Sequence, residues 1–321
     1  MLVSMTLLAL SFPNFDPVAF AIGPISVKWY GLSYMAGLLI GWWYVRKLLQ
    51  TPRIWAGGQA PFDASRVDDL LIYMTLGVII GGRLGSVLFY EPGHYFSFTQ
   101  FDVGGWKAGL PAGLIFETID VWGWKFSVPE VLETWKGGMA FHGALLGCGA
   151  AIALFARRNG VPVLSTMDLC AAAVPIGLMF GRFANFINGE LFGRPTSMPW
   201  GMVFPRVADT YPQFADIEPA PRHPSQLYES LSEGLLLFLA LRVVTHSLGG
   251  LKRPGLATGV FLFGYAIARS TCEMFRQPDP AHAFTIGWLT PGIAYSIPMA
   301  ILGVYFWHLS RTPGGAAPSQ A

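Results

Sequence analysis

Charged side chains are scarce in this sequence. Lys, Arg, Asp and Glu account for 12% of the 321 residues, whereas hydrophobic residues account for 53%. Soluble globular domains contain about twice that share of charged residues, so the composition excludes an ordinary water-soluble enzyme. The net charge is only +2, and no cluster of Lys and Arg alternates with aromatic residues in a polar segment. A nucleic-acid partner is therefore not predicted, and a polytopic membrane protein fits the composition.

The sequence also lacks the usual motifs of metal, nucleotide and acyl-serine enzymes. Its three cysteines lie in apolar stretches without the short spacing of metal or redox pairs, and no H-E-x-x-H motif is present. The motifs G-x-x-x-x-G-K-[ST], G-x-S-x-G and D-G-x-x-A-R are missing as well. We therefore predict no metal and no cofactor. We also find no internal repeat and no second soluble domain.

Seven apolar stretches approach the roughly 20 residues that a helix needs to cross a bilayer core of about 30 Å. They predict an all-α, polytopic membrane protein with seven transmembrane helices, forming a single integral membrane domain over residues 1–321. Glycine recurs inside the second and third stretches, so helices are expected to approach closely there. The predicted spans are 27–48, 69–90, 138–156, 167–187, 226–245, 256–275 and 286–308.

The positions of Lys and Arg set the expected orientation, because cytoplasmic loops retain these residues. They concentrate after the first, third, fifth and seventh spans, whereas the opposite loops hold fewer of them over more residues. We therefore predict the N-terminus outside and the C-terminus in the cytoplasm. The residues that carry this argument are Arg46, Lys47, Arg53, Arg66, Arg157, Arg158, Arg242, Lys252, Arg253 and Arg311.

Two segments on the outer side, 91–137 and 188–225, are too long to be simple turns. The first contains four tryptophans, which are expected at the membrane interface. The second is rich in proline, which predicts an ordered, extended periplasmic arm or lid rather than a helix. Residues 312–321 are predicted to be a disordered tail.

Ionisable residues inside predicted spans are candidates for function. Each charge costs about 2.5 to 3.5 kcal/mol at the centre of a bilayer, so it is kept only with a partner or in a water-filled site. We single out Arg83, Arg182, Arg269 and Glu273. A structural explanation stays open, because Arg269 and Glu273 are spaced i, i+4 and are able to neutralise each other.

The densest polar run beside a span extends from Gly181 to Arg194 and reads G-R-F-A-N-F-I-N-G-E-L-F-G-R. If it is helical, Arg182, Asn185 and Gly189 share one face through i, i+3 and i, i+7 spacing. That face would offer a cation, an amide and a gap where backbone approaches a ligand. The alternative is an interhelical hydrogen-bond network, since Asn stabilises helix packing in membranes.

His142 is a candidate base near the start of the third span, where glycines flank it. A neutral imidazole at this position is suited to accept a proton near neutral pH. A packing role is equally consistent with the sequence alone.

These features together resemble one family, the bacterial prolipoprotein diacylglyceryl transferases. The run from Gly181 to Arg194 resembles the long signature of that family, and the resemblance extends over residues 27–308. Further matches occur in family order at W-Y-G-L (29–32), the histidine segment 137–143, H-P-S-Q-L-Y-E (223–229) and the segment 265–279.

The resemblance implies a transferase of the bacterial inner (cytoplasmic) membrane with seven transmembrane helices, its active site towards the periplasmic leaflet. Such an enzyme moves the sn-1,2-diacylglyceryl group of phosphatidylglycerol to the lipobox cysteine thiol of a prolipoprotein. It forms a thioether and releases glycerol 1-phosphate, which is the first step of lipoprotein maturation. The implied partners are phosphatidylglycerol, prolipoprotein signal peptides and membrane lipid, with no nucleic acid and no metal.

The resemblance also implies roles for individual residues. We expect Arg182 and Arg269 to bind and neutralise the phosphate, because guanidinium groups form forked hydrogen bonds with phosphate oxygens. The implied catalytic set is His142, Arg182, Arg269, Tyr30 and Tyr265, with His142 as the thiol base. The expected phosphatidylglycerol-binding set is Arg182, Asn185, Glu190, Gly193, Arg269, Arg83 and Glu273.

Two positions depart from the family pattern. The connection from Glu91 to Trp135 is longer than is typical of the family, and Ala144 stands where a second glycine usually follows the histidine. Neither departure touches the charged residues. A membrane transporter or binder of an anionic solute or lipid remains the alternative, although such transporters usually contain internal repeats.

Overall fold

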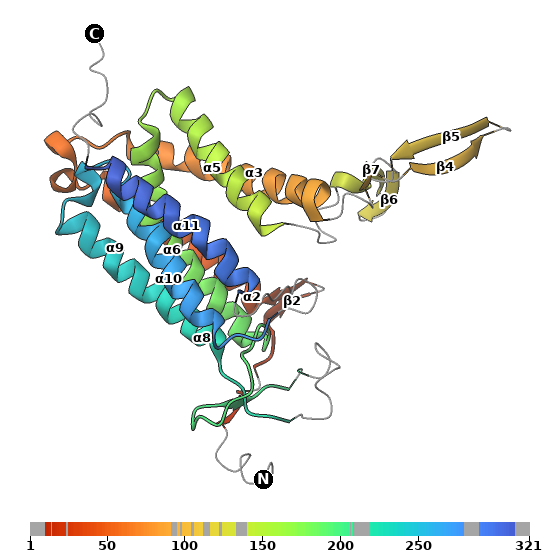
Figure 1. Cartoon of the computed structure of the whole chain (residues 1–321). Coiled ribbons are helices and arrows are strands. Elements are labelled where there is room, and N and C mark those ends of the chain that lie inside the picture. Colours follow the sequence, from red (N-terminus) through yellow and green to blue (C-terminus); the bar gives the residue numbers. More distant parts are fainter. Residues whose placement is uncertain are drawn as a thin grey trace. The chain divides into compact units, whose positions relative to one another are not determined.

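The computed structural model describes residues 10–13, 15–23, 25–90, 95–96, 98–103, 106–111, 116–121, 124–132, 140–205, 207, 219–278 and 289–311. The chain divides into two compact units. The first contains Met1–Ala64 and Leu164–Ala321, and the second contains Ser65–Val163. Both units are built mainly of helices (Figure 1). The predicted tail 312–321 lies outside the described residues.

Among its described residues, the first unit contains five long helical segments and a small extended region. Strand β1 (Leu10–Ser11) pairs in parallel with β8 (Met202–Val203), and β2 (Val18–Ile22) pairs with β3 (Ile25–Lys28) in an antiparallel hairpin. The helices are α2 (Trp29–Leu49), α6 (Val163–Ile187), α8 (Ser225–Glu229), α9 (Leu237–His246), α10 (Leu256–Glu273) and α11 (Pro291–Leu309). A π-helical turn, Ser230–Leu236, joins α8 to α9 in one continuous segment.

The second unit contains helices α3 (Val67–Gly85) and α5 (Phe141–Arg158) and two β-hairpins between them. A π-helical turn, Ser86–Tyr90, follows α3. The hairpins are β4 (Phe98–Val103) with β5 (Trp106–Pro111), and β6 (Phe116–Val121) with β7 (Trp124–Pro129). The outer segment 91–137, which was expected only to be longer than a turn, therefore contains regular strands.

Helices occupy all seven predicted spans, so a mainly helical membrane-protein fold is confirmed, but the strands β1–β8 show that the chain is not all-α. Among the described residues, three helices are long and apolar enough to cross a membrane by length and composition, namely Ala64–Leu88, Val163–Ile187 and Pro291–Leu309. Two of the other segments are less apolar or less regular for local reasons. Helix α10 contains Arg269 and Glu273, and the π-helical turn divides the segment 225–246. The number of crossings and the orientation of the termini stay predictions.

Glycine allows α3 and α5 to pack with their backbones in contact, as the sequence predicted. A Cβ atom added at Gly85 would lie 2.7 Å from the Cα atom of Gly143, and one added at Gly147 would lie 2.8 Å from the Cα atom of Gly81. Real Cβ atoms do not approach so closely, so a larger residue would separate the helices.

A buried carboxylate on α6 holds the first turn of α10. Asp168 is fully buried and accepts hydrogen bonds from the backbone N–H groups of Gly255 (2.7 Å) and Thr258 (2.8 Å) and from the Thr258 hydroxyl (2.7 Å). It therefore caps orphan N–H donors of a neighbouring helix, where a negative charge is favourable. This contact fixes α10 against α6 within the first unit.

The two hairpins of the second unit are copies of one pattern. Residues 98–111 and 116–129 share the frame F-x-x-x-D-V-x-G-W-K-x-x-x-P at an offset of 18 residues, and their registers are the same, from Phe98 opposite Pro111 to Phe116 opposite Pro129. Our expectation of no internal repeat is therefore wrong. The repeated hairpin is only 14 residues long. It has neither the helical periodicity nor the long apolar run from which the helices were predicted.

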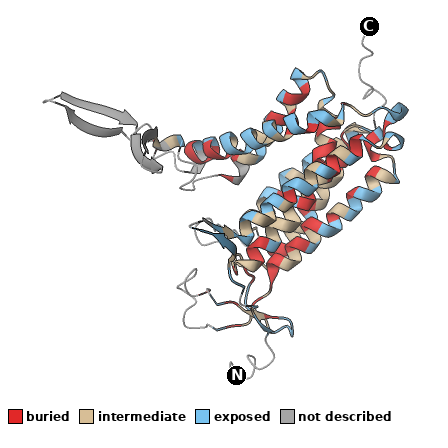
Figure 2. Cartoon of the chain, turned by 180° about the vertical axis from the view of Figure 1, so that it is seen from behind, coloured by how far each residue is buried: buried red, intermediate tan, exposed pale blue. Residues whose placement is uncertain are grey.

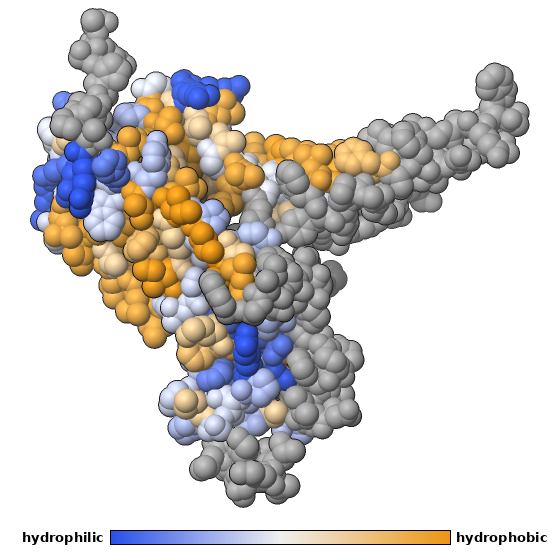
Figure 3. All heavy atoms as spheres, viewed as in Figure 1, coloured by the Kyte–Doolittle hydropathy of each residue, from blue (hydrophilic) through white to orange (hydrophobic). Residues whose placement is uncertain are grey.

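Helices of the first unit bury one stripe of side chains and expose another (Figure 2). The exposed stripe is largely apolar, and hydrophobic residues cover much of the helix surface in Figure 3. On α11, for example, Ile301 and Tyr305 are more than half exposed. An apolar outer surface on a helix bundle is typical of a protein in lipid.

Candidate functional site

Two fully buried glutamates form the centre of a charged cluster in the first unit. Glu229 ends α8 and Glu233 lies in the π-helical turn that follows, so both carboxylates leave the same segment one turn apart. Turns of this kind inside helices often mark functional sites. The Arg182 guanidinium, from α6, contacts both, with Nη1 3.1 Å from Glu229 Oε2 and Nη2 3.2 Å from Glu233 Oε2.

Arg269 reaches the same two carboxylates from α10. Its Nη1 lies 3.0 Å from Glu229 Oε1 and 3.9 Å from Glu233 Oε1, and its Nη2 lies 2.6 Å from Glu273 Oε2. The expected i, i+4 pair of Arg269 and Glu273 is confirmed, but it is only one part of a larger network. Arg276 adds a third guanidinium, 3.4 Å from Glu229 Oε1.

The cluster is neutral in formal charge and almost closed to solvent. Three arginines face three glutamates, and the side chains of Arg182 and Arg269 are only 16% and 13% exposed. Tyr265 lies one turn before Arg269 on α10 and interacts electrostatically with Arg182 and Glu233. Removing one partner from such a buried set leaves an uncompensated charge, so each member depends on the others.

A second polar group surrounds the end of α6. The amide of Asn185 donates to Glu190 Oε1 at 2.8 Å, and the Gln226 amide donates to the Glu190 carbonyl oxygen at 2.6 Å. The hydroxyl of Tyr30, on the first turn of α2, bonds to the Asn185 side chain and lies 3.2 Å from the hydroxyl of Tyr34. The structure thus brings together Tyr30, Asn185 and Glu190, three of the predicted site residues.

Helix α6 ends earlier than the shared-face argument requires. Its last residue is Ile187, and Gly189 has φ = 66°, a left-handed conformation that ends helices. Gly189 therefore does not continue the face of Arg182 and Asn185, and that expectation is wrong. Leu191 also has a positive φ of 57°, which is unusual for a residue with a branched side chain. Its carbonyl oxygen accepts a hydrogen bond from the Ser225 hydroxyl at 3.0 Å.

Gly193 lies where three segments cross. A Cβ atom at this position would lie 2.6 Å from the carbonyl oxygens of His223 and Phe275, and the Gly193 N–H donates to the His223 carbonyl at 2.8 Å. The buried Arg222 guanidinium stacks over Phe192 and donates to the Gly193 carbonyl at 3.3 Å. These contacts explain why glycine is required here, and its expected contact with lipid stays a prediction.

His223 joins a short aromatic chain beside this crossing. Its Nδ1 lies 3.1 Å from the Tyr228 hydroxyl, which accepts a hydrogen bond from the Trp200 indole at 2.7 Å. Burial lowers the pKa of His223, so the neutral imidazole is favoured. The ring also packs edge-on against Phe275.

Two predicted site residues belong to the second unit. His142 is in the first turn of α5, and its side chain lies outside the described set. Arg83 is buried at the end of α3, where its Nε donates to the Val131 carbonyl at 2.7 Å and its guanidinium lies 5.2 Å from the Tyr95 ring centre. The expected roles of both residues stay predictions.

Sequence reasoning gave no role to three acidic residues that the structure places at key positions, although Glu229 ends the quoted motif 223–229. Glu229 and Glu233 lie inside the predicted span 226–245, and Asp168 lies inside 167–187. The cost argument that identified Arg182 and Arg269 applies equally to them. Arg276 lies in the quoted segment 265–279 and was also given no role, although it follows Glu273 by less than one helical turn.

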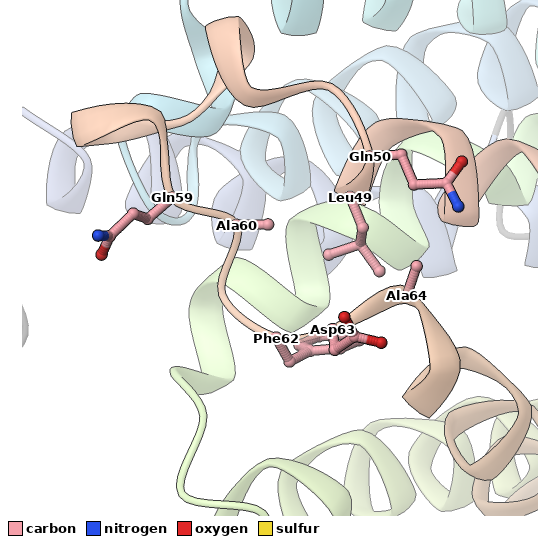
Figure 4. A pocket seen from close by; sticks show the side chains of 7 residues that line it. All are labelled: Leu49, Gln50, Gln59, Ala60, Phe62, Asp63 and Ala64. Carbon is pink, nitrogen blue, oxygen red and sulfur yellow. The ribbon is translucent and has the colours of Figure 1, made fainter.

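A surface pocket of about 490 Å³ at the end of α2 is a poor site for an anion. It is lined by seven residues that include one carboxylate, Asp63, and the amides of Gln50 and Gln59, but no Lys or Arg (Figure 4). Among the described residues, no group of three or more His, Cys, Asp or Glu side chains is arranged to hold a metal ion. The charged cluster is therefore the strongest candidate site.

Comparisons with known proteins agree with the motifs. Residues 17–309 match the profile of a family described as prolipoprotein diacylglyceryl transferase. A protein of Rhizobium meliloti (strain 1021), named phosphatidylglycerol--prolipoprotein diacylglyceryl transferase, is 43% identical over 98% of this chain and 98% of its own length. A protein of the same name from Rhodopseudomonas palustris (strain ATCC BAA-98 / CGA009) is 44% identical over 99% of this chain and 97% of its own. The similarity covers both units and the charged cluster.

Proposed function

The chain belongs to the prolipoprotein diacylglyceryl transferase family, and we propose that it transfers the diacylglyceryl group of phosphatidylglycerol to the lipobox cysteine of prolipoproteins. The observation that carries this proposal beyond the family match is the convergence of Arg182 and Arg269 on Glu229 and Glu233 in an almost closed, apolar setting. An anionic headgroup is the ligand that such a pair of arginines fits best.

We propose that all of residues 1–321 act as one integral membrane domain with seven crossings in the bacterial inner membrane. A helix of 21 residues such as α2 is about 30 Å long, which matches the hydrocarbon core. The distribution of basic residues supports an N-terminus outside and a C-terminus in the cytoplasm. In this orientation Arg182, near the end of α6, lies towards the outer leaflet.

The two arginines would act on the leaving group. Transfer breaks the bond between a glycerol carbon and phosphate oxygen, so negative charge develops on the departing glycerol 1-phosphate. Arg182 and Arg269 would stabilise that charge through N–H donors not used by Glu229 and Glu233. The glutamates hold the guanidinium planes before the lipid binds, so little reorganisation accompanies the reaction. Asn185 and Glu190, with Tyr30 beside them, would orient the glycerol headgroup.

The thiol proton needs an acceptor, because an unperturbed cysteine with a pKa of about 8.5 is mostly protonated at neutral pH. We propose His142 as this base, with Tyr30 and Tyr265 as hydrogen-bond partners in the assembled site. Arg83, Gly193 and Glu273 complete the proposed lipid-binding set. The extended segment after α6 would act as the arm that admits the signal peptide.

A direct test incubates the purified full chain in detergent containing phosphatidylglycerol with a lipobox peptide and measures the peptide mass. We expect a gain of one diacylglyceryl group, and no gain with a peptide whose cysteine is replaced by alanine. Arg182→Ala should lose the gain, whereas Arg253→Ala, a change at an exposed arginine outside the cluster, should retain it. Lipid binding without any mass gain would contradict the transferase and favour a transporter or binder of anionic solutes or lipids.

A further inference from the structure

The duplicated hairpins β4–β5 and β6–β7 have no role in the chemistry above, yet their registers give each of them two unlike faces. Successive residues of a strand alternate between faces, and paired residues share a face. Asp102 is opposite Lys107 in the first hairpin, and Asp120 is opposite Lys125 in the second. The next pairs, towards each turn, are Val103 opposite Trp106 and Val121 opposite Trp124, and they belong to the other face.

This alternation separates polar from apolar residues through most of each hairpin. The face with the Asp–Lys pairs also holds Gln100 with Gly109 and Thr118 with Ser127. The opposite face holds Val103, Trp106, Phe101, Ala108 and Leu110 in one hairpin and Val121, Trp124, Ile119, Phe126 and Val128 in the other. The pattern is interrupted at the open ends of both hairpins. Thr99 and Glu117 fall on the apolar face there, and the end pairs Phe98 with Pro111 and Phe116 with Pro129 fall on the polar face.

The two copies preserve the polarity of the faces but not the individual side chains. Phe101 in one copy corresponds to Ile119 in the other, Leu110 corresponds to Val128, and on the polar face Gln100 corresponds to Thr118. A protein partner with a fixed shape would constrain the size of each contact residue. A fluid apolar medium constrains only polarity, so the variation between copies favours lipid as the occupant.

The connections to the helices keep the hairpins near one membrane surface. Strand β4 begins ten residues after Leu88, the end of a helix apolar enough to cross a membrane, and α5 begins twelve residues after Pro129. An extended chain spans at most about 3.6 Å per residue, so neither connection is able to span more than about 40 Å. The end of α3 meets the start of α5 at Gly85 and Gly143, and both connections therefore leave the helix pair at the same end.

We propose that the apolar faces of both hairpins lie in the lipid interface on the side of the membrane where α3 ends and α5 begins. Tryptophan prefers that depth. Among the described residues, each two-stranded hairpin has two edges whose backbone N–H and C=O groups have no strand partner. Such edges exclude the hairpins from the hydrocarbon core, where no water satisfies these groups, but they are acceptable at the interface. Because each Lys is opposite an Asp, attachment depends on apolar contact and not on anionic lipid.

The test measures the accessibility of nitroxide labels on the full chain in lipid nanodiscs. Single cysteines are introduced by Phe101→Cys and Ile119→Cys on the apolar face and by Gln100→Cys and Thr118→Cys on the polar face, in a chain whose three native cysteines are replaced by alanine. We expect a several-fold higher ratio of oxygen to nickel-chelate accessibility on the apolar face in both copies. The difference should be the same in zwitterionic and phosphatidylglycerol-containing nanodiscs.

Three results would overturn the proposal. Equal ratios on the two faces would show that neither is in lipid, and protection of the apolar face from both reagents would show that protein covers it, either a second copy or a bound peptide. A difference seen only with anionic lipid would show an electrostatic contact instead.

If the cysteine-free chain does not fold, Trp106→Phe/Trp124→Phe in the native chain gives a second measurement. Lipids brominated near the headgroup should quench the fluorescence of Trp106 and Trp124, so the fraction of the emission that these lipids quench should be smaller in the variant than in the native chain. An equal fraction in both would contradict an interfacial position.

Discussion

Two helix contacts in this protein hold their partners by opposite means. Helices α3 and α5 meet through glycine, so backbone touches backbone and no polar side chain is needed at the crossing. Helices α6, α8 and α10 meet instead through three arginines and three glutamates. Close contact of small residues provides packing energy in lipid, whereas buried ion networks provide little net stability and strongly constrain geometry. The comparison predicts that steric changes in the first contact affect stability, whereas changes in the second that keep the charge affect mainly activity.

The largest expected effect is on activity at the charged cluster. Arg269→Lys retains the positive charge but loses the planar fork that contacts Glu229 and Glu273. We expect kcat/KM to fall by about 100-fold or more, as for the loss of one donor to a developing oxyanion, with little change in melting temperature. Peptide mass measured over time gives the rate, and Arg253→Lys is the matched control. Wild-type turnover in Arg269→Lys would contradict the requirement for a fork.

The next effect concerns stability at the glycine contact. Gly147→Ala places a Cβ atom 2.8 Å from the Cα atom of Gly81, whereas Gly149→Ala on the same helix extends into open space. We expect the first change to lower the free energy of unfolding by about 1–3 kcal/mol and the second to leave it unchanged or raise it by up to about 1 kcal/mol. Unfolding in mixed micelles with increasing SDS measures both. Equal effects would mean that close approach does not hold α3 and α5 together.

A smaller effect is expected where α6 caps α10. Asp168→Ala removes the acceptor of the Gly255 and Thr258 donors, so we expect a loss of about 1–2 kcal/mol. Activity should fall as well, because α10 carries Arg269. The same unfolding assay applies, and the effects of Asp168→Ala and Thr258→Val should be less than additive. Full additivity would show that the two side chains do not act together.

The smallest effect is a pH dependence at His223. Burial lowers its pKa in the folded protein, whereas the unfolded imidazole titrates near 6.5. Above about pH 6.5 both states are neutral, and as the pH falls below this value the unfolded state binds the proton first, so stability declines. His223→Gln should flatten the stability profile below about pH 6.5 relative to wild type. A steeper profile in the variant would reverse the assigned direction.

The sequence predicted the positions of helices better than their interruptions. Apolar runs of about 20 residues are specified by composition, so α2, α6 and α11 begin and end within a few residues of the predicted spans. The π-helical turn at Ser230–Leu236 carries no comparable signal, because it depends on packing against α6, where Gly234 contacts Met179.

The candidate site was predicted in part. Arg182, Arg269, Asn185 and Glu190 were identified from motif and cost, but their partners Glu229 and Glu233 were overlooked although the same cost applies to them. The distances among residues so far apart in sequence depend on how α6, α8 and α10 pack, which no local pattern encodes. The hairpin repeat is present in the sequence. Finding it requires comparison of the sequence with itself at an offset of 18 residues, because a search for helical or strand periodicity does not detect it.

The pairing of β1 with β8 has a consequence for how many times the chain crosses the membrane. Residues joined by backbone hydrogen bonds lie on one side of the bilayer, so an even number of crossings must separate Leu10 from Met202. Among the described residues, four long helices, α2, α3, α5 and α6, lie between them. In the described part of the chain, the bridge between Gly193 and Arg276 encloses two more long helical segments, again an even number. This parity argument uses no loop charge, and it predicts that the N-terminal strand, the segment after α6 and the end of α10 lie at one membrane surface if each of these helical segments crosses the bilayer.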